Sequence, residues 1–430
     1  MITRRRLVRG LATLAAASHS GVTSAVYAQA NPRVVIIGGG FGGMTAATYL
    51  KRAAPSVHVT LIERNPQLTT SVFSNLFLGG LRTLQSITHS YAPLKAQGID
   101  VLTDVAIDVD TTRKIVTLMS GTRVSYDRLV LAPGVDMRFD SIDGYGPEAA
   151  RIMPHAWRTG EQMTILKTQI DAMPDGGVVV VAPPPEPYSG PAAPYERACM
   201  LAHFLKTRKP RSKLVVVDQK RSFFSQAAFM EGFKRHYAGI LELRLTDEKD
   251  NYQLQSINPA TSTITTRNGA TLRADVANIV PRQKAGGIAY RAGCVKDDWC
   301  PIDPDNFAST EVKDVFIVGD ASIATEMPKT AFSANSQGKL VARLLASELA
   351  GKEVFPQRLR DTTWAVLAPG DSVKSGANYT VGLKEGAKRL IASDEFASAP
   401  GEDPLERSQN FEEAVGWYSG ITHDMFGKWG

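Results

Sequence analysis

A glycine-rich turn that directly follows a buried strand constrains the fold of this 430-residue chain more than any other feature. Residues 34–37 (Val-Val-Ile-Ile) form a continuous apolar run, which is typical of a parallel strand buried on both faces. The run continues into the pattern G-x-G-x-x-G at residues 38–43. Residues 44–52 have the composition of a helix, and a second apolar strand over 57–62 ends at the acid Glu63. Strand, turn, helix and strand in this order predict an α/β unit of the Rossmann type.

Each glycine of this pattern has a physical role. Gly38 permits the tight turn, Gly40 lets the backbone approach a diphosphate, and Gly43 allows the helix to pack closely on the strand. The helix N-terminus adds unpaired N–H groups and a partial positive charge. Glu63 lies 20 residues after Gly43, where an acid accepts both hydroxyl groups of an adenosine ribose. The first unit is therefore predicted to bind a dinucleotide.

Two later segments favour FAD over NAD. Residues 126–134, a strand that ends in a turn of small residues, resemble the A-T-G crossover of flavoproteins with two dinucleotide domains. Residues 314–321 resemble the second FAD fingerprint of those proteins, in which a strand delivers an aspartate, here Asp320, to the ribityl and diphosphate region. Three fingerprints in the order of that family predict FAD.

A second strand–loop–helix–strand unit over residues 175–218 lacks a phosphate cradle. In pyridine-nucleotide disulfide reductases a second glycine fingerprint follows the first strand of this unit. Here residues 182–191 contain five prolines and a single glycine, Gly190. Proline has no N–H group to offer a phosphate, so we expect no NAD(P)H site in this unit. Asp218, at the end of the next strand, does not supply a site alone.

The first 30 residues carry the pattern of an export signal. Residues 3–9 resemble the twin-arginine motif, and Ala28-Gln29-Ala30 forms an A-x-A cleavage site after an alanine-rich stretch. A membrane anchor is the alternative, but polar residues at 18–20 interrupt a stretch that needs about 20 apolar residues to span. The sequence therefore predicts a periplasmic protein, exported by the twin-arginine pathway, with no membrane span after cleavage.

Charge and cysteine content argue against several other classes. The chain has 49 basic and 43 acidic residues, but four basic residues lie in the first 30, which leaves an excess of two. That excess is too small to indicate nucleic-acid binding. Cys199, Cys294 and Cys300 lack paired C-x-x-C spacing, and no histidine cluster accompanies them, so no metal site is expected.

With these motifs the mature chain resembles the flavoprotein subunit of flavocytochrome c sulfide dehydrogenase, a relative of sulfide:quinone oxidoreductase. Further matching segments are 74–75, 79–80, 194–197, 299–303, 327–339 and 417–427. In that family FAD takes two electrons from sulfide and passes them singly to a periplasmic c-type cytochrome subunit. The resemblance implies a small reduced-sulfur substrate and a c-type cytochrome subunit or soluble cytochrome c as partner. The predicted cofactor-binding residues are Gly38, Gly40, Phe41, Gly42, Gly43, Glu63, Arg64, Ser71, Asn75, Val105, Ala132, Gly134, Gly319, Asp320, Lys329 and Ala331.

The chain departs from this family at three cysteine positions. The family links its flavin through a cysteine where this chain has Ser71, which implies noncovalent FAD. The two cysteines of the family's redox disulfide correspond to Gly190 or its neighbours and to Thr363. Attack of sulfide on a protein disulfide needs those sulfur atoms. Cys199 is expected to be an inert buried thiol, and Cys294 and Cys300 either pair or are structural.

Two charged residues are candidates for catalysis near the flavin. Lys329 would place a cation there, and a helix from about Asn335 would aim its N-terminus at the pyrimidine end. The alternative is a solvated lysine and an ordinary helix start. Glu196 is a candidate general base, and a salt bridge to Arg197 or another basic residue is its alternative role.

These signals predict an α/β chain with two Rossmann-like dinucleotide-binding-type domains and a C-terminal region that covers the flavin. The predicted parts are the signal peptide 1–30, the FAD-binding domain 31–140 and 255–345, the second domain 141–254, and the C-terminal region 346–430 with an exposed loop at 396–407. The predicted function is a periplasmic FAD-dependent oxidoreductase that passes electrons from sulfide or another reduced sulfur donor to a c-type cytochrome. The alternative is an accessory or electron-transfer subunit that has lost sulfide oxidation.

Overall fold

The apolar run at residues 34–37 lies in β1 (Arg33–Ile37), the middle strand of a five-stranded parallel sheet. The computed structural model describes residues 31–352 and 358–427. The other strands of this first sheet, ordered β20-β9-β1-β2-β5, are β20 (Val315–Ile317), β9 (Arg128–Leu131), β2 (His58–Glu63) and β5 (Ile99–Thr103). Because the strands are parallel, the turns that follow β1, β2, β9 and β20 meet at one edge of the sheet.

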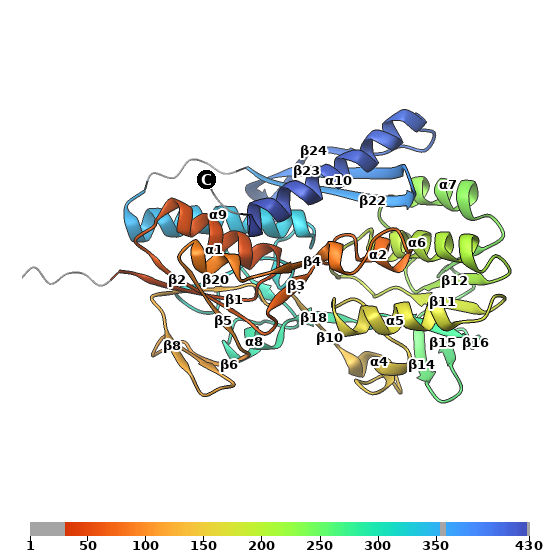
Figure 1. Cartoon of the computed structure of the whole chain (residues 1–430), viewed down its shortest axis with the longest axis horizontal. Helices are drawn as coiled ribbons and strands as arrows, with labels where there is room; N and C mark the ends of the chain where they lie inside the picture. The colour runs from red at the N-terminus through yellow and green to blue at the C-terminus, as the bar shows by residue number, and fades with distance from the viewer. Residues whose placement is uncertain (1–30, 353–357, 428–430) are drawn as a thin grey trace, which may run out of the picture. The chain divides into compact units, whose positions relative to one another are not determined.

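Two helices that are far apart in the sequence cover this sheet side by side. They are α1 (Phe41–Ala53), which follows β1, and α9 (Ala331–Ala350), which follows the turn after β20 (Figure 1). A Cβ atom on Gly338 would lie only 2.6 Å from the carbonyl oxygen of Gly42, so the absence of a side chain lets the two helices approach closely. The predicted α/β fold and its first Rossmann unit are therefore confirmed.

The second sheet is also parallel and has the order β13-β12-β11-β17. Its strands are β11 (Val178–Ala182), β12 (Lys213–Asp218), β13 (Leu241–Leu245) and β17 (Val276–Ile279). The helices α5 (Glu161–Ala172), α6 (Ala193–Arg208) and α7 (Gln226–Tyr237) belong to this unit. An antiparallel pair, β10 (Val135–Met137) and β18 (Gln283–Ala285), connects the two units.

The structure differs from the predicted domain boundary at residue 254. The strands β14 (Leu254–Asn258), β15 (Thr263–Thr266) and β16 (Thr271–Arg273) precede β17, which pairs with β11 of the second sheet. Side chains from these strands share one core with β11 and β12. Residues 255–279 therefore pack with the second unit and not with the FAD-binding unit, because the chain completes the second sheet before it returns.

The C-terminal region is an antiparallel sheet and a long helix that extend across both units. The strands are β22 (Leu359–Ala368), β23 (Asp371–Lys384) and β24 (Ala387–Ala397), and the helix is α10 (Pro404–Phe426). Figure 1 shows α10 running from the side of α7 towards α1 and α9. The exposed loop predicted at 396–407 is wrong at both ends, because β24 continues to Ala397 and α10 begins at Pro404.

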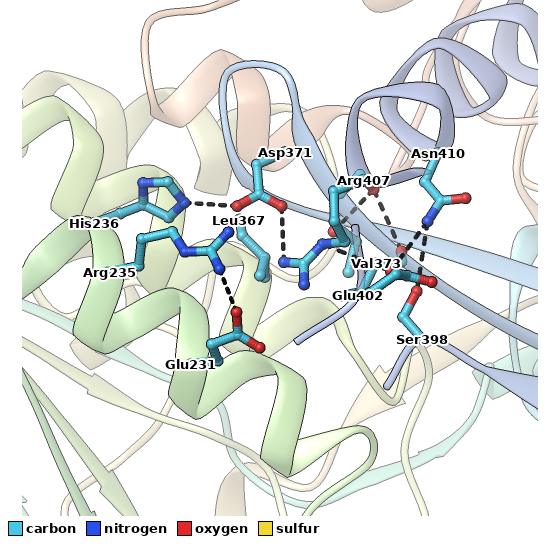
Figure 2. Close-up of polar contacts among 12 residues, drawn as sticks. Glu231, Arg235, His236, Leu367, Asp371, Val373, Ser398, Glu402, Arg407 and Asn410 are labelled. Atoms are coloured by element: carbon cyan, nitrogen blue, oxygen red, sulfur yellow. Dashed lines mark hydrogen bonds and ion pairs between the residues drawn. The ribbon is translucent and has the colours of Figure 1, made fainter. Parts of the chain in front are cut away.

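A buried cluster of charges fixes the first turn of α10 to the second unit (Figure 2). The Arg407 side chain is only 2% exposed, and its Nη2 lies 2.7 Å from Asp371 Oδ1. The other carboxylate oxygen of Asp371 lies 2.6 Å from Nε2 of His236, in the last turn of α7. Glu402 lies 3.8 Å from Arg407 Nε on the opposite side. One guanidinium thus joins the C-terminal helix, the start of β23 and α7.

Replacement of Arg407 by methionine is expected to destabilise the fold strongly. The change leaves the buried carboxylate of Asp371 without its main cation, so the free energy of unfolding should fall by about 3 kcal/mol. The matched control is Arg389→Met, whose ion pair with Glu385 (2.9 Å) lies at the surface and should contribute less than about 1 kcal/mol. Urea unfolding followed by circular dichroism measures both; equal losses for the two variants would contradict the role of the cluster.

Across the described ranges 31–352 and 358–427, no helix combines the length and the apolar character that a membrane crossing requires. The predicted signal peptide, residues 1–30, lies outside the described residues.

Candidate functional site

A cavity of about 700 Å³ lies where the first sheet, the second unit and the C-terminal region meet. Its volume is in the range of ordinary cofactor and substrate sites. Most of the predicted site residues line it, including Ser71, Gly190 and Thr363, which the resemblance assigned to the family's cysteine positions. These lining residues are Gly38, Gly40, Phe41, Gly42, Glu63, Arg64, Ser71, Asn75, Val105, Ala132, Gly134, Gly190, Glu196, Gly319, Asp320, Lys329, Ala331 and Thr363. Gly43 does not line the cavity; a Cβ atom there would lie 1.9 Å from Gly38 O, so it serves helix–strand packing.

The first wall of the cavity is the turn between β1 and α1. Gly40 is the N-cap of α1, and a Cβ atom on it would meet no atom within 4 Å, so the backbone here is open to a ligand. The first N–H groups of α1 have no partners within the helix and favour an anion. Glu63, at the end of β2, accepts a hydrogen bond from the Gly39 N–H (2.8 Å). The acid that the sequence assigned to a ribose thus lies beside the turn.

Tyr91 supports this turn and was not predicted from the sequence. Tyr91 donates a hydrogen bond from its hydroxyl to Gly39 O (2.8 Å) and is only 2% exposed. Burial raises the pKa of Tyr91, so the phenol stays a neutral donor. Its ring lies 5.8 Å from that of Phe426 in the last turn of α10. No local pattern marks Tyr91, because the contact depends on the position of two other segments.

The second wall is formed by the turn after β20 and the start of α9. Lys329 donates two hydrogen bonds from Nζ, to Asp320 O (2.9 Å) and Ser322 O (2.6 Å), and lies over the ring of Trp299 at 4.0 Å. Burial lowers the pKa of Lys329 to about 8. The alternative of a freely solvated lysine is therefore wrong. The predicted start of a helix near Asn335 is four residues late, since α9 begins at Ala331.

The start of α9 has a carboxylate beside it. Asp361 accepts hydrogen bonds from the hydroxyl groups of Thr330, the N-cap residue, and of Ser333 (3.0 Å). Thr363 donates from its hydroxyl to the other oxygen of Asp361 (3.1 Å). Burial raises the pKa of Asp361, while these donors and the helix N-terminus oppose that effect. The threonine at the family's cysteine position is thus part of a hydroxyl–carboxyl network.

Glu196 lines the third wall, in the first turn of α6, and its carboxylate is held from two sides. It accepts hydrogen bonds from Asn75 Nδ2 (2.7 Å) and from the N–H of Val366 (2.9 Å). Burial raises the pKa of Glu196. The alternative salt bridge is not formed, because Arg197 directs its guanidinium to Asn75 Oδ1 (3.0 Å) and Asn278 Oδ1 (3.1 Å). Glu196 is therefore a cavity carboxylate with raised proton affinity.

None of the three cysteines, which all lie in the part of the chain that the structure describes, lines the cavity. Cys199, Cys294 and Cys300 are free, buried thiols. Burial raises the pKa of Cys294 to about 11 and that of Cys300 to about 12. Buried thiols with raised pKa values are poor nucleophiles. The described wall of the cavity thus contains no thiol, and the three thiols elsewhere in the described chain are poorly reactive.

In the second unit, the acid at the end of β12 is paired with neighbouring side chains. Asp218, at the end of β12, accepts a hydrogen bond from the Tyr195 hydroxyl (2.6 Å) and pairs with Lys220 Nζ (2.9 Å). Lys220 also donates to Pro184 O (3.0 Å) in the proline loop. The ring of Phe223 stacks on Tyr195 at 3.6 Å. The acid at the end of β12 is thus paired internally, and the lack of an NAD(P)H site in this unit stays a prediction.

Three family models match successive parts of the chain. Residues 32–180 match the pyridine nucleotide-disulphide oxidoreductases, residues 163–281 the central part of the sulfide dehydrogenase [flavocytochrome c] flavoprotein chain, and residues 356–426 the flavin-binding part of flavocytochrome c sulphide dehydrogenase. The flavoprotein chain of that enzyme from Chlorobaculum thiosulfatiphilum is 51% identical over 43 residues, which are 10% of this chain and 90% of that relative. The chain belongs to the sulfide dehydrogenase flavoprotein family.

Proteins that are less similar to this chain in sequence share its fold. The sulfide-quinone reductase of Aquifex aeolicus is 34% identical over 185 residues, so the match spans 42% of this chain and 41% of the relative. The solved structure of the sulfide:quinone oxidoreductase from that bacterium superposes with a TM-score of 0.68 at 19% identity, over 91% of this chain and 92% of the other. The structure of a putidaredoxin reductase–putidaredoxin complex gives 0.66 at 16% identity over 92% and 98%.

The family establishes FAD as the cofactor of this sulfide dehydrogenase-type flavoprotein. The residues of the cavity fit this group. Gly40 leaves room for a close approach of a diphosphate, the α1 N-terminus offers unpaired N–H groups, and Glu63 and Asp320 offer carboxylates at the ends of their strands. These residues would hold the dinucleotide across the edge of the first sheet.

Replacement of Gly40 by leucine is expected to abolish tight FAD binding without unfolding the protein. The new side chain would enter open space where the diphosphate approaches, so the dissociation constant for FAD should rise more than about tenfold. The matched control is Gly420→Leu on α10, where a Cβ atom also meets nothing within 4 Å but lies outside the cavity. Flavin content after gel filtration and the melting temperature of the apoprotein measure the two effects. Yellow Gly40→Leu protein would contradict the placement of the diphosphate.

Proposed function

We propose that this chain is an exported, periplasmic oxidoreductase that takes electrons from sulfide or another small reduced-sulfur donor and passes them to a c-type cytochrome. The family supports the sulfur donor and the cytochrome acceptor. The twin-arginine pattern of residues 3–9 supports export. The internal pairing of Asp218 argues against a nicotinamide nucleotide as the electron source.

The observation that carries this proposal is one cavity that joins the FAD-binding turn to Glu196 and contains no thiol in its described wall. FAD supplies the acceptor for two electrons. Oxidation of hydrogen sulfide to elemental sulfur releases two electrons and two protons, so the site needs a proton acceptor as well. Glu196, whose pKa burial raises, is placed to accept one of these protons. The donor then reacts in the cavity directly, without a protein disulfide as relay.

Three aromatic rings at the wall of the cavity support an electron acceptor on the side of the C-terminal region. Phe332, Trp364 and Trp417 all line the cavity and are all partly exposed. The Trp417 ring lies 5.6 Å from Phe332 and 5.5 Å from Trp364. A partly exposed aromatic cluster that also faces the flavin site is a suitable contact for a cytochrome, because amphipathic rings are favoured at protein interfaces.

The second candidate function is an accessory or electron-transfer subunit that has lost sulfide oxidation. The observation that favours it is the placement of Ser71, Gly190 and Thr363 around the cavity, in the positions where the family has its flavin-linking and redox cysteines. In this version the chain keeps the flavin and the acceptor contact, and another protein reduces the flavin.

The flavin is expected to leave the polypeptide when the protein is denatured in acid. A serine hydroxyl at position 71 does not form the thioether that a cysteine forms, so the yellow colour should appear in the supernatant after precipitation. The variant Ser71→Cys provides a matched test, because it restores the family's residue at this position. Flavin that stays with the precipitated wild-type chain would contradict noncovalent binding.

Anaerobic titration with sulfide separates the two candidate functions. If the chain oxidises sulfide directly, the flavin absorption band of the holoprotein should bleach and added cytochrome c should then be reduced. The variant Glu196→Gln should bind FAD normally but bleach about a hundredfold more slowly, since general-base catalysis commonly contributes this much. Glu412→Gln, an exposed acid on α10, is the control. A flavin that does not bleach at millimolar sulfide supports the accessory role.

A further inference from the structure

The proline loop of the second unit makes two hydrogen bonds with the first unit. The hydroxyl of Ser189 donates a hydrogen bond to Asp320 Oδ2 at 2.7 Å, across 131 residues of sequence. The next N–H group, that of Gly190, donates to Lys329 O at 2.7 Å. The loop of residues 182–191, which in a nucleotide-binding unit would hold a second dinucleotide, therefore touches the turn that follows β20.

Asp320 depends on this contact because its environment disfavours a charge. It lines the cavity at the end of β20, and burial raises its pKa. Among the hydrogen bonds of the described ranges, Ser189 is the single donor to its carboxylate. Lys329 is the charged group that faces it, but the Lys329 ammonium is directed at backbone carbonyl groups, including that of Asp320 itself.

Ser189 is itself held in place. Its N–H donates to Gln283 Oε1 at 2.9 Å, and Gln283, in β18, is only 1% exposed. The remainder of the loop is anchored by Lys220, which donates to Pro184 O. The hydroxyl of Ser189 therefore has a defined position on a loop that packing fixes at both ends.

We propose that Ser189 is a positioning residue for FAD, and that the proline loop has exchanged a role in binding a second dinucleotide for one in orienting the Asp320 carboxylate towards the first. An acid at this position accepts hydrogen bonds from the hydroxyl groups of a bound dinucleotide, and a fixed second donor prevents it from turning away. The inference rests on FAD binding alone and does not depend on the electron donor.

The test is the affinity of the apoprotein for FAD, measured by quenching of flavin fluorescence. For Ser189→Ala we expect the dissociation constant to rise about tenfold at pH 7, because a hydrogen bond to a charged group is lost. Ser189→Thr keeps the hydroxyl and should restore most of the affinity. Ser419→Ala, at an exposed position on α10, is the control for a serine-to-alanine change.

The pH dependence identifies the group through which Ser189 acts. A hydrogen bond to the carboxylate favours its charged form, so its loss should raise the pKa of Asp320 further. FAD affinity should then decline at a higher pH in Ser189→Ala than in the wild type as the pH is lowered. In an Asp320→Asn background this shift should disappear, and Ser189→Ala should have little further effect on affinity.

Three outcomes would overturn the proposal. The first is equal FAD affinity and an equal pH profile for the wild type and Ser189→Ala. The second is an equal loss of affinity from Ser189→Ala in the presence and absence of the Asp320 carboxylate. The third is a Ser189→Ala protein that fails to fold while Ser189→Thr folds but binds FAD about tenfold more weakly than the wild type; a melting temperature for each apoprotein accompanies the titrations to identify this case.

Discussion

The unpaired N–H groups at the start of α1 are the constraint on which the arrangement of this site depends. A helix that begins at the buried edge of a parallel sheet exposes several donors and a partial positive charge in a place that water reaches poorly. Such a helix end favours an anion, and Gly40 leaves the space for one. The neighbouring features support this turn. Glu63 accepts from the N–H of Gly39, Tyr91 donates to the C=O of Gly39, and Phe426 packs on the ring of Tyr91.

The two Rossmann units of the chain differ in the turn that follows their first strand. The first keeps an open turn and receives FAD. The second has prolines in the loop after β11, which offer no N–H donors, and its acid at the end of β12 is paired with Tyr195 and Lys220. A buried carboxylate without a partner would be costly, and Tyr195 and Lys220 supply partners for Asp218. What remains of the second unit supports the first, through Ser189 and Gly190.

The parts that sequence predicted well are those with local signals. The order of β1, the glycine turn, α1 and β2 follows from periodicity and from residues within about 30 positions. The missed features are contacts between distant segments. Ser189 and Asp320 lie 131 residues apart, and Arg407 lies in a stretch whose serine, proline and acid content indicated an exposed loop. Its burial follows from Asp371 and His236, which no local pattern connects to it.

The boundary near residue 254 was misplaced for a related reason. Strands β14 to β16 give a short antiparallel pattern that fits either unit, and the pairing of β17 with β11 and the shared core with β11 and β12 assign them to the second. The start of α9 was placed late because its N-cap, Thr330, is supported by Asp361 from another strand. In each case local composition allowed two positions for the boundary, and a contact between residues distant in the sequence determines which one the structure has.

The described wall of the cavity contains the buried carboxylate of Glu196 but no thiol, and this combination bears on the choice between the two candidate functions. Glu196 is held by Asn75 and by a backbone N–H of β22, which orients it without supplying a full opposite charge. An electron-transfer subunit without substrate chemistry has no need for a carboxylate whose proton affinity burial raises, because desolvating that group costs stability. A more stable wall would place an apolar residue there. The Glu196–Asn75 pair therefore supports the proposed donor, which gives up protons in this cavity, over the accessory role.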